Sequence, residues 1–428
     1  MAVAVAILAS FQLKVAAQES SDSLLKRQLT DYGIRFTNGN RAKLLTSGQQ
    51  KFDDMFETIR QARHSIHLEY FNFRNDSIAS LLFDLLRQKR REGVEVRALF
   101  DGFGNDSNNQ PLKKHHLKAL RNDSIDIREF DPIRFPWVNH LWPRDHRKIV
   151  VIDGCVAYTG GMNVADYYIN GTEELGEWRD MHCRIDGPAI NQLQLIFMRV
   201  WKKVTGETVT GEEYFYPTRA DGRLEHFKLS EPTTSNAQIG IINREPGTHH
   251  TDDGQLLGRN NAMRRLYVWS IDSARDSIKI INPYFTLLPS VRKALKRALK
   301  RGVKLEIMVS VKCDEPLTPD VVLRNVHKLM KKGAIVWYYQ PGFHHSKVMM
   351  VDGRMCTVGS TNLDARSLRF DYEENALFLD RDMTHALEEV FTRDTKKSER
   401  LTQESWKRMS TFRRKLSGTI GYLLQPVL

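Results

Sequence analysis

One short motif occurs twice in this chain, and its repetition limits the possible folds more than any other feature. Each copy has a His, a Lys two positions later, an Asp after four intervening residues, and an Asn after a cluster of small residues. The two copies are His146, Lys148, Asp153 and Asn163, and His345, Lys347, Asp352 and Asn362. The same residues in the same register, 199 positions apart, predict two equivalent half-sites that share one chemistry.

The repeat extends beyond the motif. Residues 62–73 and 274–285 each read as the end of a helix, an apolar strand and an aromatic finish. Each is followed by an amphipathic helix, a Gly and a further strand. The runs 149–153 and 348–352 are continuously apolar, as expected for strands buried on both faces. This alternation predicts an α/β protein of two similar α-β-α sandwich lobes, with the active site at the interface between them.

The domain organisation follows from the repeat. We expect a first lobe over 36–205, a polar connection over 206–236, and a second lobe over 237–428 with a basic and then apolar tail. That tail is either a packed terminal helix or a contact with a membrane surface. Residues 1–35 hold a short apolar stretch, which we interpret as a signal or the remnant of a membrane anchor.

The charge of the chain bears on its partners. Its 428 residues carry a formal net charge of +12 at pH 7. A surplus of that size favours partners that bear phosphate, either nucleic acid or an anionic lipid surface, although a basic surface without a dedicated partner is also compatible with it. Charge alone does not choose between these classes.

The motif residues suit the chemistry of a phosphodiester. If the two copies face each other, one neutral imidazole can attack the phosphorus while the other, protonated, gives its proton to the leaving oxygen. Lys148 and Lys347 are expected as permanent cations, and Asn163 and Asn362 as amide donors, around the anionic oxygens. We therefore expect no metal and no cofactor.

Each catalytic His also needs a carboxylate that fixes its tautomer. The candidates are Asp180 for the first half and Glu374 for the second, which lie at similar positions downstream of their His. Glu373 is among the residues that compete for this role. Asp153 and Asp352 stand at the far end of the motif strand, roughly 16 Å from the His if the chain is extended. We expect them to have a structural role in the following turn.

These residues resemble the phospholipase D superfamily, whose signature is the same duplicated motif. The first copy departs from it by having Gly161 where Ser is usual. Within the superfamily the chain is most similar to bacterial cardiolipin synthases, over roughly residues 40–428. Supporting segments include HLEYF at 67–71, FHHSKVMMVDG at 343–353 and VGSTNLDARSLRFDYEEN at 358–375.

The resemblance implies a phosphohistidine mechanism. His146 is the expected nucleophile and His345 the expected acid and base, although the equivalence of the halves does not order them. Two phosphatidylglycerol molecules would give cardiolipin and glycerol. The implied partners are phosphatidylglycerol, other anionic phospholipids and the surface of the bacterial cell membrane. Such synthases usually have two transmembrane helices before the lobes, where this sequence has one short apolar stretch. We therefore expect an enzyme that is peripheral, anchored by a short N-terminal segment, or exported.

Three other functions remain open at this level. A phospholipase D would pass the same phosphatidyl group to water and release phosphatidic acid. A metal-independent nuclease would use the same histidines, but nucleic acid is not the expected partner, because no aromatic platform with interleaved basic residues is evident. A non-catalytic lipid-binding scaffold would not require intact His, Lys and Asn in both halves.

Overall fold

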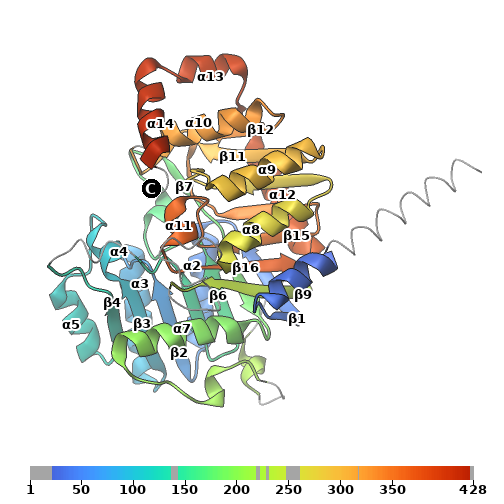
Figure 1. Ribbon diagram of the computed structural model, residues 1–428. Coiled ribbons are helices and arrows are strands. Elements are labelled where there is room, and N and C mark those ends of the chain that lie inside the picture. Colours follow the sequence, from blue (N-terminus) through green and yellow to red (C-terminus); the bar gives the residue numbers. More distant parts are fainter. Residues whose placement is uncertain are drawn as a thin grey trace, which may run out of the picture.

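The computed structural model describes residues 22–135, 143–217, 222–227, 231–246, 261–316 and 318–424. Within these residues, fifteen strands form one continuous sheet (Figure 1). The first half of the chain contributes β1 (Phe36–Leu45), β2 (Ser65–Tyr70), β3 (Glu95–Asp101), β4 (Asp126–Phe130), β5 (Ile149–Ile152), β6 (Val156–Gly160) and β8 (His182–Asp186). The second half contributes β9 (Thr234–Arg244), β10 (Ser277–Ile281), β11 (Lys304–Ser310), β12 (Ile335–Tyr339), β14 (Val348–Val351), β15 (Met355–Gly359), β16 (Glu373–Leu379) and β17 (Ser398–Arg400).

The order of the strands repeats on either side of the centre of the sheet. From one edge it runs β4-β3-β2-β5-β6-β8-β1, and from the other, after β17, it runs β12-β11-β10-β14-β15-β16-β9. The two series meet where β1 and β9 pair antiparallel. Each half is therefore a copy of the other, turned about an axis between β1 and β9, and the expected pair of α/β lobes is confirmed.

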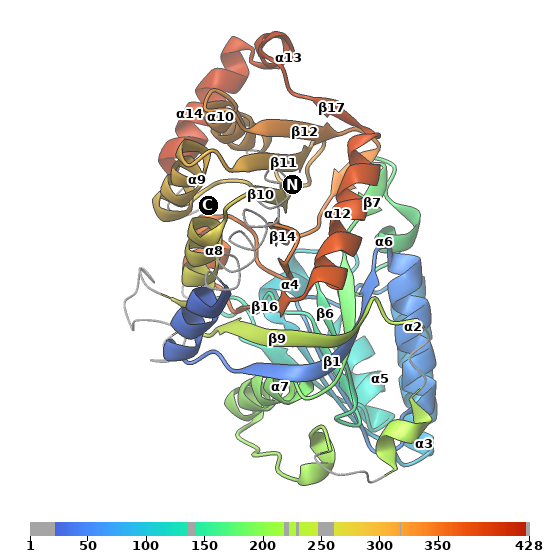
Figure 2. The same ribbon diagram turned by 90° about the vertical axis from the view of Figure 1, so that its right-hand side faces the viewer.

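Helices cover both faces of the sheet (Figures 1 and 2). The first half has α2 (Gly48–Gln61), α3 (Ser77–Arg91), α4 (Gly102–Asp106), α5 (Lys114–Asn122), α6 (Tyr167–Asn170) and α7 (Ile190–Thr205). The second half has α8 (Ala262–Ser273), α9 (Pro289–Lys300), α10 (Thr318–Met330), α11 (Ala365–Arg369), α12 (Arg381–Thr395), α13 (Gln403–Met409) and α14 (Phe412–Leu424). The connection between the halves contains the short 3-10 helices Glu212–Tyr214 and Arg223–His226.

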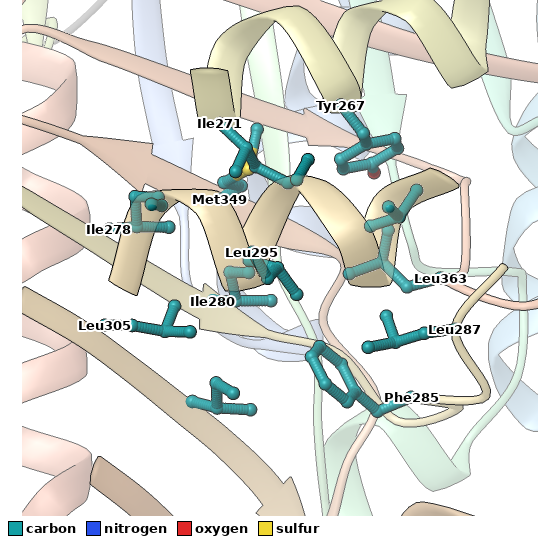
Figure 3. Close-up of a cluster of buried hydrophobic side chains, with 14 of the residues drawn as sticks. Tyr267, Ile271, Ile278, Ile280, Phe285, Leu287, Leu295, Leu305, Met349 and Leu363 are labelled. Atoms are coloured by element: carbon teal, nitrogen blue, oxygen red, sulfur yellow. The ribbon is translucent and has the colours of Figure 1, made fainter. Parts of the chain in front are cut away.

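The largest core lies between the sheet of the second half and helices α8 and α9. Figure 3 shows part of it, with side chains from both helices, from three strands and from the loops that follow β10 and β15. The labelled members are Tyr267, Ile271, Ile278, Ile280, Phe285, Leu287, Leu295, Leu305, Met349 and Leu363. Leu363 directly follows Asn362, so this core anchors the loop that carries one motif residue into the site.

The end of the segment before the first lobe packs on the second half. Residues 22–31 are helical, and Leu25 and Leu29, apolar residues at helical spacing, are buried in its core. The interpretation of residues 1–35 as a signal or anchor remnant stays a prediction. Residues 1–21 lie outside the described residues. Among the described helices, none has the length and apolar character needed to cross a membrane.

Asp153 and Asp352 hold the same position in the two halves. Each follows its motif strand with a positive φ, of 52° and 53°. The Asp153 carboxylate accepts hydrogen bonds from the backbone N–H groups of residues 63–65, at 2.7–2.9 Å. The Asp352 carboxylate accepts the equivalent bonds from residues 275–277, at 2.8–2.9 Å. Each carboxylate thus ties the end of its motif strand to the start of the neighbouring strand.

We expect Asp153→Asn to destabilise the protein. The side-chain NH₂ of Asn would face a backbone N–H that the Asp153 carboxylate now accepts, so that this N–H would lose its hydrogen bond. The free energy of unfolding should fall by about 1–3 kcal/mol. Asn tolerates the left-handed backbone, so strain should add little. Chemical denaturation would measure the change. Asp123→Asn, which breaks an exposed ion pair with Arg87, is the control and should cost less than about 1 kcal/mol.

Candidate active site

The two motif copies meet in one cavity. Its volume is about 650 Å³, and its wall includes His146, His345, Asn163 and Asn362. Phe71, Trp178 and Tyr284 are among the aromatic residues that complete the wall. Residues that are far apart in the sequence thus come together between the lobes, where the expected site lies.

Backbone hydrogen bonds fix each His against the other half of the chain. The His146 N–H donates to the carbonyl of Tyr372 at 3.0 Å, and the His345 N–H donates to the carbonyl of Arg179 at 2.6 Å. A small parallel sheet of β7 (Glu177–Arg179) and β13 (Gly342–His344) supports the second contact. The backbone just before each motif strand is therefore held in place by the opposite lobe.

The carboxylate partners are also exchanged between the halves. The Nδ1 atom of His345 lies 2.8 Å from Oδ2 of Asp180, and the Nδ1 atom of His146 lies 3.1 Å from Oε1 of Glu373. Asp180 therefore contacts the His of the other half, where a partner within its own half was expected. The choice of Glu374 is wrong, because Glu373 makes the contact.

The register of the strands explains why Glu373 is the partner. Gly161 N–H donates to the carbonyl of Met181, and Ser360 N–H donates to the carbonyl of Glu374. Met181 and Glu374 are therefore equivalent, as are the residues before them. Neighbouring side chains on a strand point to opposite sides, so Glu374 turns away when Glu373 faces the imidazole. Burial raises the pKa of Glu374 to about 8.

The departure from the motif at Gly161 has a structural reason. In the second half the Ser360 hydroxyl donates a hydrogen bond to the carboxylate of Glu373. In the first half a Cβ atom at Gly161 would lie 2.3 Å from Oδ1 of Asp180. The carboxylate of Asp180 therefore occupies the space of the missing side chain. Gly at position 161 thus makes room for the carboxylate of Asp180, and its presence does not indicate a loss of function.

Lys148 and Lys347 are buried beside the histidines. The Lys148 amine donates to the carbonyl of His146, and the Lys347 amine lies 3.0 Å from Nε2 of His345. Burial lowers the pKa of Lys148 to about 7 and that of Lys347 to about 8. Burial therefore weakens the charged form of both amines in the ligand-free site, where permanent cations were expected. A bound phosphate would favour the charged form of both amines.

The two histidines have different electrostatic surroundings. Burial lowers the pKa of both, and the nearby lysines hold that of His146 well below its ordinary value. Burial also raises the pKa of Glu373 to about 7. Although burial acts against it, Lys347 and the bond to His345 keep the pKa of Asp180 below its usual range. His345 therefore faces an ionised carboxylate, which offsets part of the lowering of its pKa, while the pKa of His146 is lowered further.

The motif asparagines present amide groups to the cavity. Both residues are buried, and among the described residues the Oδ1 atoms of Asn163 and Asn362 have no hydrogen-bond partner. In the part of the chain that the structure describes, no cluster of three or more His, Cys, Asp or Glu residues is arranged to hold a metal ion. Both asparagine side chains thus lie in the cavity wall, and within the described part of the chain their Oδ1 atoms are unpartnered acceptors there.

Comparison with known proteins identifies the family. Residues 55–201 and 267–395 match a family model described as cardiolipin synthase, PLD-like domain. The chain belongs to the cardiolipin synthase family. A cardiolipin synthase of Oceanobacillus iheyensis is 33% identical over 393 residues, which cover 92% of this chain and 76% of that protein. Cardiolipin synthase 2 of Staphylococcus epidermidis is 34% identical over 394 residues, which cover 92% and 75%.

A solved structure has the same fold. The crystal structure of a phosphatidylserine synthase from Haemophilus influenzae superposes with a TM-score of 0.68 and covers 96% of this chain and all of its own. The sequence identity is 15%, so this likeness concerns the fold alone. It confirms the two-lobed architecture, and the family match confirms the resemblance that the motifs carry.

We expect Glu373→Gln and Glu374→Gln to differ sharply. The first change replaces the carboxylate that orients His146 through its Nδ1 atom, and turnover should fall on the order of 10²- to 10⁴-fold. The second should change it less than about threefold, because a side chain whose pKa is about 8 is largely protonated at pH 7 and an amide resembles it. Initial rates of cardiolipin formation at pH 7, with circular dichroism to verify folding, would measure both. Similar losses in the two variants would contradict this assignment.

Proposed function

We propose that this protein is a cardiolipin synthase that joins two phosphatidylglycerol molecules into cardiolipin and releases glycerol. The observation that carries the proposal is the pair of crossed contacts, His146 with Glu373 and His345 with Asp180, around one cavity. Both Nδ1 atoms are engaged by carboxylates, so Nε2 is the ring nitrogen of each His that is directed to the chemistry, and the Lys347 amine lies 3.0 Å from that of His345. Family membership supports the choice of lipid substrates.

The first step transfers a phosphatidyl group to the enzyme. Nε2 of neutral His146 attacks the phosphorus of the donor lipid and forms a P–N bond. The bond from phosphorus to the glycerol oxygen breaks, and the imidazolium of His345 gives its proton to that oxygen. Glycerol leaves. The difference between Glu373 and Asp180 described above supports this division of roles.

The second step reverses the proton transfer. A hydroxyl of a second phosphatidylglycerol gives its proton to the now neutral His345 and attacks the phosphorus. A P–O bond forms, the P–N bond breaks, and cardiolipin leaves while His146 is regenerated. Lys148, Lys347 and the amides of Asn163 and Asn362 would stabilise the charge that develops on the phosphoryl oxygens in both steps.

We expect purified protein to convert phosphatidylglycerol in micelles into equal amounts of cardiolipin and glycerol. In His345→Ala the proton donor of the first step and the proton acceptor of the second are both lost, so cardiolipin formation should fall on the order of 10²- to 10⁴-fold, and the phosphatidyl adduct that forms should be on His146. Mass spectrometry of the denatured protein would locate it. Phosphatidic acid as the dominant product would instead indicate a phospholipase D, and an adduct on His345 in a His146→Ala variant would reverse the two roles.

We further infer that α14 contacts the surface of an anionic membrane. Phe412, Leu416 and Ile420 lie on one face of this helix and are 83%, 53% and 50% exposed. Arg413 and Lys415 beside them are also exposed. An exposed apolar stripe with flanking cations suits a helix that lies in the headgroup region of a bilayer. The bacterial cell membrane, which holds phosphatidylglycerol, is the matching surface.

The opposite face of α14 packs on α10 (Figure 1). Arg414 forms an ion pair with Asp320 at 2.6 Å, and Gly418 lies so close to Asp320 that a Cβ atom would be 2.7 Å from its carbonyl oxygen. Thr318, at the start of the same helix α10, lines the cavity. The apolar stripe is therefore held next to the cavity wall, which would bring the site to the lipid surface.

We expect Phe412→Ser combined with Leu416→Ser to weaken binding to phosphatidylglycerol-containing vesicles by about tenfold or more, because two apolar side chains no longer leave water. Co-sedimentation at fixed lipid concentration would measure this. Leu81→Ser, which alters a leucine of similar exposure (58%) on α3, is the matched control and should bind as the parent protein does. Unchanged vesicle binding, or a loss of self-association with no loss of vesicle binding, would contradict the inference.

A further inference from the structure

Arg74 is a cation in the cavity wall that the mechanism above does not use. Its guanidinium lines the same cavity as the two histidines. The nearest carboxylate oxygen, Oδ2 of Asp76, is 3.9 Å away, which is too far for a hydrogen bond. That carboxylate already accepts bonds from the backbone N–H groups of Ala79 and Asp166. Among the described residues, the buried Nε of Arg74 has no hydrogen-bond partner.

Arg366, a second arginine of the cavity wall, is different. Its Nε donates to Oδ2 of Asp371 at 2.7 Å, and its guanidinium lies over the ring of Phe103 at 5.1 Å. Arg366 is therefore engaged by a carboxylate in the ligand-free protein. Arg74 is partly buried, with 17% of its side chain exposed. Its buried Nε has lost hydration without gaining a hydrogen bond from the described residues, and an anionic ligand would supply the missing acceptor. Of these two arginines in the cavity wall, Arg74 is the one whose Nε lacks an acceptor in the described part of the chain.

A series of ring contacts connects Arg74 to His345, whereas the ring against His146 is that of Phe71, at 5.1 Å. The Arg74 guanidinium lies 5.5 Å from the centre of the Tyr167 ring. Tyr167 lies 4.3 Å from Trp178, and Trp178 lies 5.5 Å from the His345 imidazole. These three rings line one continuous wall from the acid and base to the guanidinium. His146 is not part of this series.

The acceptor lipid must occupy that side of the cavity. Its hydroxyl gives a proton to His345, so its glycerol group lies against this imidazole when it attacks. The acceptor also carries a phosphodiester of its own, which the glycerol group joins to the reacting phosphorus in the product. This second phosphate lies within one glycerol length of the first, and the motif residues are already committed to the reacting group. It needs a separate cation.

We propose that Arg74 binds the phosphate of the acceptor phosphatidylglycerol. This inference rests on the proposed function and adds the determinant of the second substrate. The planar guanidinium can donate two hydrogen bonds to two phosphate oxygens at once, with the Tyr167 ring beneath it. Arg74 thereby holds a phosphate-bearing alcohol beside His345 in preference to water or a simple alcohol.

Two reactions of the same enzyme isolate this contact. Exchange of isotope-labelled glycerol into phosphatidylglycerol uses the donor lipid, the His146 adduct and His345, but its acceptor has no phosphate. Cardiolipin formation uses the same groups and an acceptor that has one. In Arg74→Gln, kcat/KM for cardiolipin formation should fall about 10- to 100-fold, while glycerol exchange stays within about threefold. Arg74→Lys should recover part of the loss, because it restores the charge without the paired donors.

Arg128→Gln is the control for loss of a positive charge, because Arg128 is half exposed on β4 and pairs with Asp126. It should leave both reactions unchanged. Equal losses of cardiolipin formation and glycerol exchange in Arg74→Gln would overturn the inference, since Arg74 would then support the donor site or the fold. Full cardiolipin formation in Arg74→Gln would overturn it as well. Failure of the proposed function is distinguishable, because the parent protein itself would then make no cardiolipin.

Discussion

The site depends on the exchange of carboxylates between the two halves of the chain. His345 takes its partner Asp180 from the first half, and His146 takes its partner Glu373 from the second. Backbone bonds to Arg179 and Tyr372, the residues just before these carboxylates, hold each His in the same crossed manner. Neither half could therefore orient its own imidazole, which gives a physical reason for two similar lobes to remain in one chain.

The continuous sheet holds the two lobes in the relative position that the exchanged contacts need. Pairing of β1 with β9 fixes the two lobes through backbone hydrogen bonds. On one side of the site, Asp394 of α12 binds both Arg179 and His344, at 2.6 and 3.2 Å. These are the neighbours of Asp180 and His345, so a single carboxylate braces the strand ends on which the crossed contact depends. Geometry of this kind keeps a catalytic pair in place before substrate binds.

The repeat is symmetric in its backbone and asymmetric in its chemistry. Asp180 occupies the space that Gly161 leaves open, whereas the longer Glu373 is held by the Ser360 hydroxyl. The pKa of Asp180 stays below its ordinary value, while burial raises that of Glu373 to about 7. The two histidines therefore begin in different environments. A duplicated motif supplies two equal imidazoles, and their surroundings lower the pKa of His146 further than that of His345.

The sequence by itself determined the duplicated α/β fold, the family and the motif residues, because strand periodicity and short spacings are local properties of the chain. The tertiary structure decided how these residues combine. The loops before β8 and β16 differ in length, so similar positions downstream of each His did not separate Glu374 from Glu373, while strand register selects Glu373. The crossed partners, the lowered pKa values of the buried lysines and the unpaired Arg74 depend on which groups burial brings together, and no local pattern encodes that.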